Sequence, residues 1–172
     1  MNALLSYLLT VILTAHALNA MKSETIKFSQ LPGECAAEYD PFLRKERKTD
    51  STAAIMYDLD GDGINEILIW TGNGGSGGEE WSIMRKDSRG WHRLGKVFGL
   101  LYRVDAEPYR GLLVCSPCGW DQATWSFYQL QSGKLHKTMD FEITYSRPVR
   151  ERPIEIKIKY ASKVHSLLKR VK

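Results

Sequence analysis

The nine residues from Asp58 to Glu66, Asp-Leu-Asp-Gly-Asp-Gly-Ile-Asn-Glu, place four carboxylates in one short loop. Unpaired, so many like charges would repel each other and destabilise the fold. A divalent cation removes that repulsion, and calcium takes about six to eight oxygen ligands, which alternating carboxylates on a curled backbone provide. Gly63 permits the sharp turn. The sequence therefore predicts one structural calcium ion (Ca2+), held by the side chains of Asp58, Asp60, Asp62 and Glu66 and the main-chain carbonyl of Ile64.

The first half of this loop matches an EF-hand, but Ile69 stands where the closing glutamate of an EF-hand belongs, and the flanking residues favour strands. The pattern Asp-x-Asp-Gly-Asp-Gly-x-x-Glu between two strands resembles the calcium-binding hairpin of FG-GAP and VCBS repeats, although the last ligand there is often Asp. The resemblance covers residues 52–72. It implies a calcium-binding hairpin at residues 52–70 and a role in binding rather than in catalysis.

Three cysteines, Cys35, Cys115 and Cys118, form the second group of reactive side chains. In an oxidising compartment one pair is expected to form a disulfide, which leaves one thiol over. Cys115 and Cys118 have the spacing of a redox motif, but a redox site needs that motif at a helix N-terminus, and the residues that follow favour a turn. We therefore expect a structural disulfide. The sequence leaves open whether Cys35 pairs with this loop or the loop closes on itself.

Two loops interrupt the strand patterns and are expected to carry a partner surface, because binding residues concentrate on loops that a rigid scaffold holds. Residues 72–80 formally match the G-x-S-x-G motif of hydrolases, but a strand follows the serine, and the glycines indicate a flexible connection. Residues 117–123 place an exposed tryptophan beside an acid. The predicted surface consists of Gly74, Ser76, Glu79, Glu80, Trp120 and Asp121.

Apolar and polar residues alternate with a period of two through most of the chain, which is typical of strands with one buried and one exposed face. Residues 52–57 and 66–70 flank the acidic loop, and residues 154–160 alternate most clearly. These patterns predict a mainly β fold, an antiparallel meander or sandwich of hairpins. Short helices are expected near the N-terminus, within residues 34–48, and at the C-terminus, over residues 161–172.

The start of the chain has the pattern of a secretory signal. The first 20 residues contain no charged side chain, and residues 3–13 are almost wholly apolar. This stretch is shorter than the ~20 residues of a spanning helix and ends in small residues that a signal peptidase accepts. We expect a signal peptide over residues 1–20, cleaved after Ala17 or Ala20, and a periplasmic or secreted protein. Residues 21–172 then form a single β-rich domain, not integral to the membrane.

The expected location limits the function. From residue 147 onward, nine basic residues face only Glu151 and Glu155, but an exported protein rarely meets nucleic acid, so no nucleic-acid partner is predicted. Since no catalytic centre is recognisable, we expect a non-enzymatic binding protein for a protein partner or an envelope glycan. An inhibitor or immunity protein against an envelope-targeting enzyme is one concrete form. The alternative is a small envelope hydrolase that combines Asp121 with Glu79 or Glu80.

Overall fold

The computed structural model describes residues 20–39, 45–46, 48–74, 78–106, 109–118, 122–145, 153–160 and 163–168. Apart from Ala20, the predicted signal peptide lies outside these residues. Within them, no helix has the length and apolar character that crossing a membrane requires.

The strands form two antiparallel sheets in which every pair of neighbours is also consecutive in sequence. Sheet A contains β1 (Glu24–Lys27), β2 (Ser51–Tyr57), β3 (Glu66–Gly74), β4 (Gly78–Asp87) and β5 (Gly90–Phe98). Sheet B contains β6 (Leu100–Ala106), β7 (Tyr109–Pro117), β8 (Gln122–Gln131), β9 (Lys134–Tyr145), β10 (Pro153–Tyr160) and β11 (Lys163–Leu168). The predicted mainly β meander of hairpins is confirmed.

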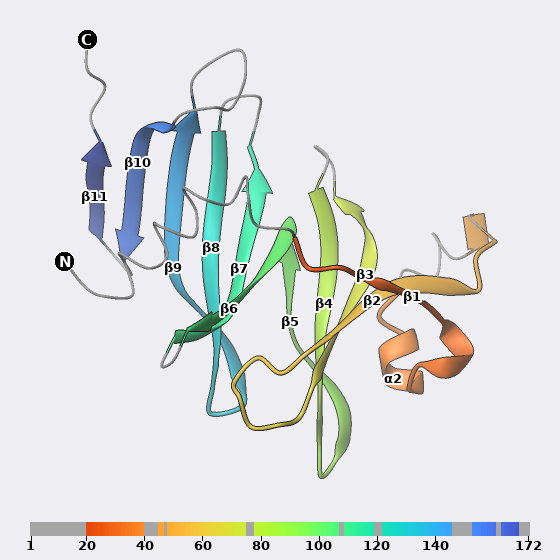
Figure 1. Ribbon diagram of the computed structural model, residues 1–172. Coiled ribbons are helices and arrows are strands. Elements are labelled where there is room, and N and C mark those ends of the chain that lie inside the picture. Colours follow the sequence, from red (N-terminus) through yellow and green to blue (C-terminus); the bar gives the residue numbers. More distant parts are fainter. Residues whose placement is uncertain are drawn as a thin grey trace.

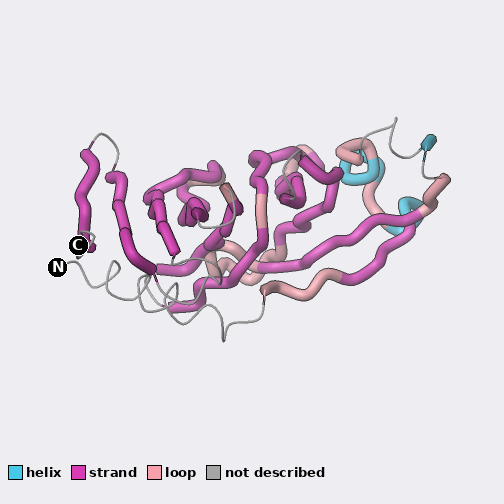
Figure 2. Tube along the Cα trace, turned by 90° about the horizontal axis from the view of Figure 1, so that it is seen from above, coloured by secondary structure: helices cyan, strands magenta, loops and turns pink. Residues whose placement is uncertain are grey.

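Helix is confined to the N-terminal part of the described residues. A 3-10 turn, η1 (Phe28–Gln30), precedes the single-turn helix α2 (Gly33–Ala36), which lies beside sheet A (Figure 1). Within the described part of the range 34–48, where a helix was expected, helix is present at the start, in α2, and again at residues 45–46. In Figures 1 and 2, α2 and β11 lie at opposite ends of the molecule.

The helix predicted over residues 161–172 is wrong where the structure describes that segment. Residues 163–168 form β11, which pairs with β10 from Tyr160 opposite Lys163 to Ile158 opposite His165. A helix of so few residues is marginal in water. The edge of β10 instead offers a row of backbone N–H and C=O groups, and pairing satisfies these groups. Hydrogen bonding to a neighbouring strand thus overrides the helical periodicity.

The central strands of sheet A, β2 to β4, bury apolar side chains on both faces. One face meets sheet B, and the other is covered by the segment that contains η1 and α2. The core between the sheets includes Ile55, Leu59, Leu68, Trp81, Ile83, Leu101, Leu112 and Val114. The core beneath the N-terminal segment includes Phe28, Leu31, Cys35, Tyr39, Ala54, Ile67, Ile69 and Met84. Because side chains alternate along a strand, Leu68 enters one core while Ile67 and Ile69 enter the other.

Gly99 joins β5 of sheet A to β6 of sheet B. Its φ angle is +134°, and a Cβ at this position would lie 2.2 Å from the carbonyl oxygen of Cys115. A real Cβ cannot come so near to backbone, so any other residue must move the β5–β6 junction away from β7. The close approach of this junction to β7 therefore requires glycine here.

Replacing Gly99 by Ala is expected to lower the free energy of unfolding by about 3 kcal/mol or more, because backbone clash and φ strain combine. Gly33→Ala is the control, since its φ is ordinary and nothing lies within 4 Å of the added Cβ. That variant should differ from the wild type by less than about 0.5 kcal/mol. Urea unfolding measures both, and equal stability of the two variants would contradict this account of the junction.

The predicted disulfide is not formed, since none of the three cysteines is bonded to another. Cys115 lies in β7, and Cys118 follows directly after that strand. Three steps along an extended chain separate the two Cα atoms by about 10 Å and turn the side chains to opposite faces, whereas a disulfide needs about 7 Å or less. Accordingly, Cys115 is buried and Cys118 is exposed, with its Sγ 3.3 Å from Oγ1 of Thr124. Cys35 lies in the core beneath the N-terminal segment.

In the native protein, only Cys118 is expected to react quickly with a thiol reagent such as Ellman's reagent. Burial raises the pKa of Cys35 to about 12, helped by the nearby carboxylates of Glu34 and Glu38, and Cys115 is buried. Unfolding without reductant should release all three thiols, and Cys118→Ser should abolish the fast native reaction. Fewer than three thiols in the unfolded protein would mean that a disulfide forms after all.

Candidate metal centre

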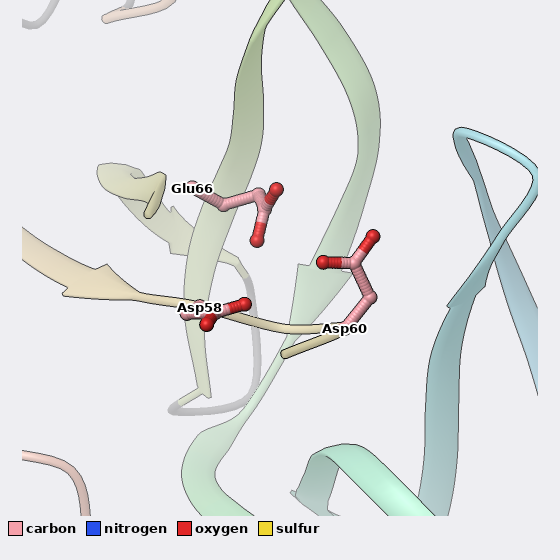
Figure 3. Close-up of side chains that lie close together, drawn as sticks. All are labelled: Asp58, Asp60 and Glu66. Atoms are coloured by element: carbon pink, nitrogen blue, oxygen red, sulfur yellow. The ribbon is translucent and has the colours of Figure 1, made fainter. Parts of the chain in front are cut away.

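The acidic loop between β2 and β3 brings three of its four carboxylates together. Asp58, Asp60 and Glu66 each offer one oxygen, and these oxygens all lie within 4.8 Å of one another. Figure 3 shows the three carboxylates facing a common space. Glu66 is fully buried, Asp58 is partly buried and Asp60 is exposed. Three convergent carboxylates of this kind could hold a metal ion.

The loop folds because its acidic side chains bind its own backbone. Asp58 Oδ1 accepts a hydrogen bond from the N–H of Gly61 at 2.7 Å, and its Oδ2 accepts one from Gly63 at 3.0 Å. Asp62 Oδ1 accepts one from Ile64 at 2.8 Å. Both glycines adopt the left-handed conformation, with φ of +82° and +85°. The spacing of Asp and Gly thus determines the local shape of the loop.

Glu66, the first residue of β3, is the buried end of the site. Its Oε2 accepts a hydrogen bond of 2.8 Å from the N–H of Leu59, a fully buried core residue. Desolvation raises the pKa of Glu66 and outweighs the Leu59 N–H and the Arg85 guanidinium, which lower it. Desolvation also raises the pKa of Asp58, but there the N–H groups of Gly63 and Gly61 and the charge of Arg110 prevail and lower it.

Arg85 of β4 contacts three carboxylates of the loop and was not predicted from the sequence. Its guanidinium lies 2.7 Å from Glu66 Oε1 and 3.0 Å from Asp60 Oδ2, and it also pairs with Asp62. The hairpin register could have identified this residue, because Ile67 of β3 pairs with Met84 of β4 and so places Arg85 beside Glu66.

Arg110 of β7 approaches the same loop from sheet B. Its Nε donates a hydrogen bond of 2.9 Å to the carbonyl oxygen of Asp58, and its guanidinium lies 3.7 Å from the carboxylate. Nothing in the sequence indicates this contact, because it depends on how the two sheets pack. Four carboxylates against these two guanidinium groups leave the described site with a net charge of two negative units, which a divalent cation would balance.

The structure brings together only some of the predicted calcium ligands. Asp58, Asp60 and Glu66 converge as expected, whereas Asp62 stands outside the triad and points to Arg85. The side chain of Ile64 is exposed, and its N–H is bound by Asp62.

The predicted partner surface is only partly described. Ser76, Trp120 and Asp121 lie outside the described residues, and Gly74 is the last residue of β3. Glu80 is engaged within the fold: its Oε1 accepts hydrogen bonds from Lys96 at 2.7 Å and from Thr71 at 2.9 Å. The hydrogen bond from Lys96 is the main reason why the pKa of Glu80 is lowered. The hydrolase alternative depends on Asp121 and so on a residue that is not described.

The two loops of that surface begin close together. The N–H of Gly99 donates to the carbonyl of Glu79 at 2.8 Å, and the Ser116 hydroxyl donates to the carbonyl of Phe98. Phe98 and Gly99 thus lie between the start of β4 and the end of β7, and these two strand ends lie at the same end of the fold (Figure 1).

The chain matches no protein-family model, and no curated protein or solved structure is significantly similar to it. The role of the loop must therefore be inferred from its own residues and geometry.

Replacing Arg85 by Gln is expected to lower the free energy of unfolding by about 3 kcal/mol in the presence of a chelator, because buried Glu66 loses its cationic partner. Arg93→Gln is the matched control, since Arg93 pairs with Glu38 at 3.0 Å in an exposed position. Its loss should cost less than about 1 kcal/mol. If chemical unfolding gives equal losses for both variants, Arg85 does not stabilise the loop.

Proposed function

We propose that this protein is an exported, non-enzymatic binding domain whose loop from Asp58 to Glu66 binds one structural calcium ion. The observation that carries the proposal is the convergence of Asp58, Asp60 and Glu66 on one space, with oxygens within 4.8 Å of one another. Aspartate side chains that bind the loop's own N–H groups hold these oxygens in place, so little ordering is left for the ion to impose.

The number of oxygens that this loop can offer favours calcium over magnesium. Calcium takes about six to eight oxygen ligands in a flexible geometry, whereas magnesium needs a small octahedral shell and usually keeps several waters. Three carboxylates that converge within 4.8 Å, with a fourth carboxylate and a main-chain carbonyl in the same loop, match the larger shell. The hard, anionic donor set also suits calcium better than a softer transition metal.

The resemblance to FG-GAP and VCBS hairpins supports the same assignment. It implies that Asp62 and the carbonyl of Ile64 complete the shell formed by Asp58, Asp60 and Glu66. Asp62 pairs with Arg85, but it is the most exposed of the four acids and can turn with least cost. Arg85 and Arg110 would then balance the charge that the ion leaves.

A structural ion agrees with a binding role for the domain. Calcium would stiffen the turn between β2 and β3, the two strands next to each other in sheet A. The other ends of the strands would be free to present ligand-binding side chains on a rigid support. The partner would be a protein or an envelope glycan in the periplasm or outside the cell. An inhibitor or immunity protein is one form of such a module.

Calcium in about hundredfold excess over its Kd is expected to raise the melting temperature by about 5–10 °C, because it binds the folded state only. Calorimetry should give one site per chain, and magnesium should have a smaller effect. Asp60→Ala should melt like the chelated protein and lose the response. Arg85→Gln should gain more from calcium than the wild type, since the ion replaces a lost cation. No heat and no shift with calcium would refute the metal site.

A further inference from the structure

Arg85 binds carboxylate oxygens that the proposed calcium ion would need. One nitrogen of its guanidinium, Nη1, lies 2.7 Å from Glu66 Oε1 and 3.0 Å from Asp60 Oδ2, and the other, Nη2, pairs with Asp62. An atom that bridges two carboxylates takes much the same place as a shared metal ion, since calcium lies about 2.3–2.6 Å from each of its oxygens. Three of the four carboxylates of the loop are thus already paired with a positive charge.

The pairing is strong because it is partly buried. The side chain of Arg85 is 14% exposed and that of Glu66 is 0% exposed. The β3–β4 register supports the contact, because Ile67 pairs with Met84 and so places Arg85 beside Glu66. Opposite charges attract each other more strongly where water is excluded. Without a metal ion, Arg85 therefore stays on these oxygens and neutralises part of the charge of the loop.

Calcium and the Arg85 guanidinium cannot share these oxygens. A calcium ion bound to Glu66 and Asp60 would lie close to Nη1, and two cations so near to each other repel strongly in a partly buried place. The guanidinium has a way out, because Asp60 and Asp62 lie toward the solvent, with side chains 25% and 37% exposed. Arginine also has a long side chain, which can turn to water while its backbone stays in β4.

We infer that Arg85 is a tethered competitor of calcium: it holds the acidic loop together when the ion is absent, and it turns toward solvent when calcium binds. This inference rests on the proposed function, because it concerns the regulation of the same site. The competition lowers the calcium affinity of the loop, since ion pairs must break before the ion gains its ligands. It also keeps the β2–β3 turn folded before any calcium is met.

Arg110 offers a matched control, because it brings the same charge to the loop through different contacts. Its Nε donates to the main-chain carbonyl of Asp58 at 2.9 Å, and its Nη2 lies 3.7 Å from the Asp58 carboxylate. Arg110→Gln therefore removes one positive charge near the loop and leaves the ion pairs of Arg85 in place. Arg85→Gln removes the same charge and the competitor as well. The difference between the two variants in calcium affinity measures the competition.

The experiment is a calorimetric calcium titration of the wild type, Arg85→Gln and Arg110→Gln. Arg85→Gln should bind calcium at least about tenfold more tightly than the wild type, whereas Arg110→Gln should gain less than about threefold, the effect of the lost charge alone. Equal gains in the two variants, or no gain in Arg85→Gln, would overturn the inference. Calcium binding by the wild type in that case would leave the proposed metal site standing.

A second measurement uses the wild type and so does not depend on how well Arg85→Gln folds. In protein labelled with 15N-arginine, the guanidinium signals of Arg85 are assigned by their loss in Arg85→Lys. Saturating calcium should shift these signals to the positions and fast hydrogen exchange of a solvent-exposed arginine, and unchanged signals would overturn the inference. Binding by Arg85→Gln alone would support the competition and refute a calcium site in the native protein. Binding by neither would refute both proposals.

Discussion

The structure depends on the neutralisation of four carboxylates that the sequence concentrates in one turn. Two guanidinium groups contribute, and they come from different sheets: Arg85 from β4 of sheet A and Arg110 from β7 of sheet B. The acidic loop is therefore an electrostatic junction between the sheets as well as a turn. Leu59, the second residue of the loop, is fully buried in the core between them. Ion pairs thus hold the charged side chains of this loop, and the burial of Leu59 holds the loop against the core.

That junction has a consequence for the rest of sheet A. The β2–β3 hairpin is held at one end by the loop and along its length by cores on both faces, which leaves its other end to present polar side chains. There Ser51 and Trp70 line a pocket. The acidic loop and this pocket thus lie at opposite ends of one hairpin.

The cysteines and the basic C-terminal segment show where local patterns mislead. Cys115 and Cys118 are close in sequence, but an extended strand turns them to opposite faces, and only the strand geometry reveals this. Residues 163–168 have an apolar periodicity that a helix and a strand can both satisfy at this length. The edge of β10 decides between them, because a neighbouring strand can form hydrogen bonds with its backbone N–H and C=O groups.

The sequence by itself determined the features that depend on near neighbours. Alternating apolar residues predicted the meander of hairpins, and the spacing of acids and glycines predicted the turn and the convergence of Asp58, Asp60 and Glu66. Only the tertiary structure decided what lies opposite these elements: the two guanidinium groups at the loop and the pairing of β11. The physical reason is that backbone geometry relates residues a few positions apart, whereas contacts between distant residues depend on how whole sheets pack.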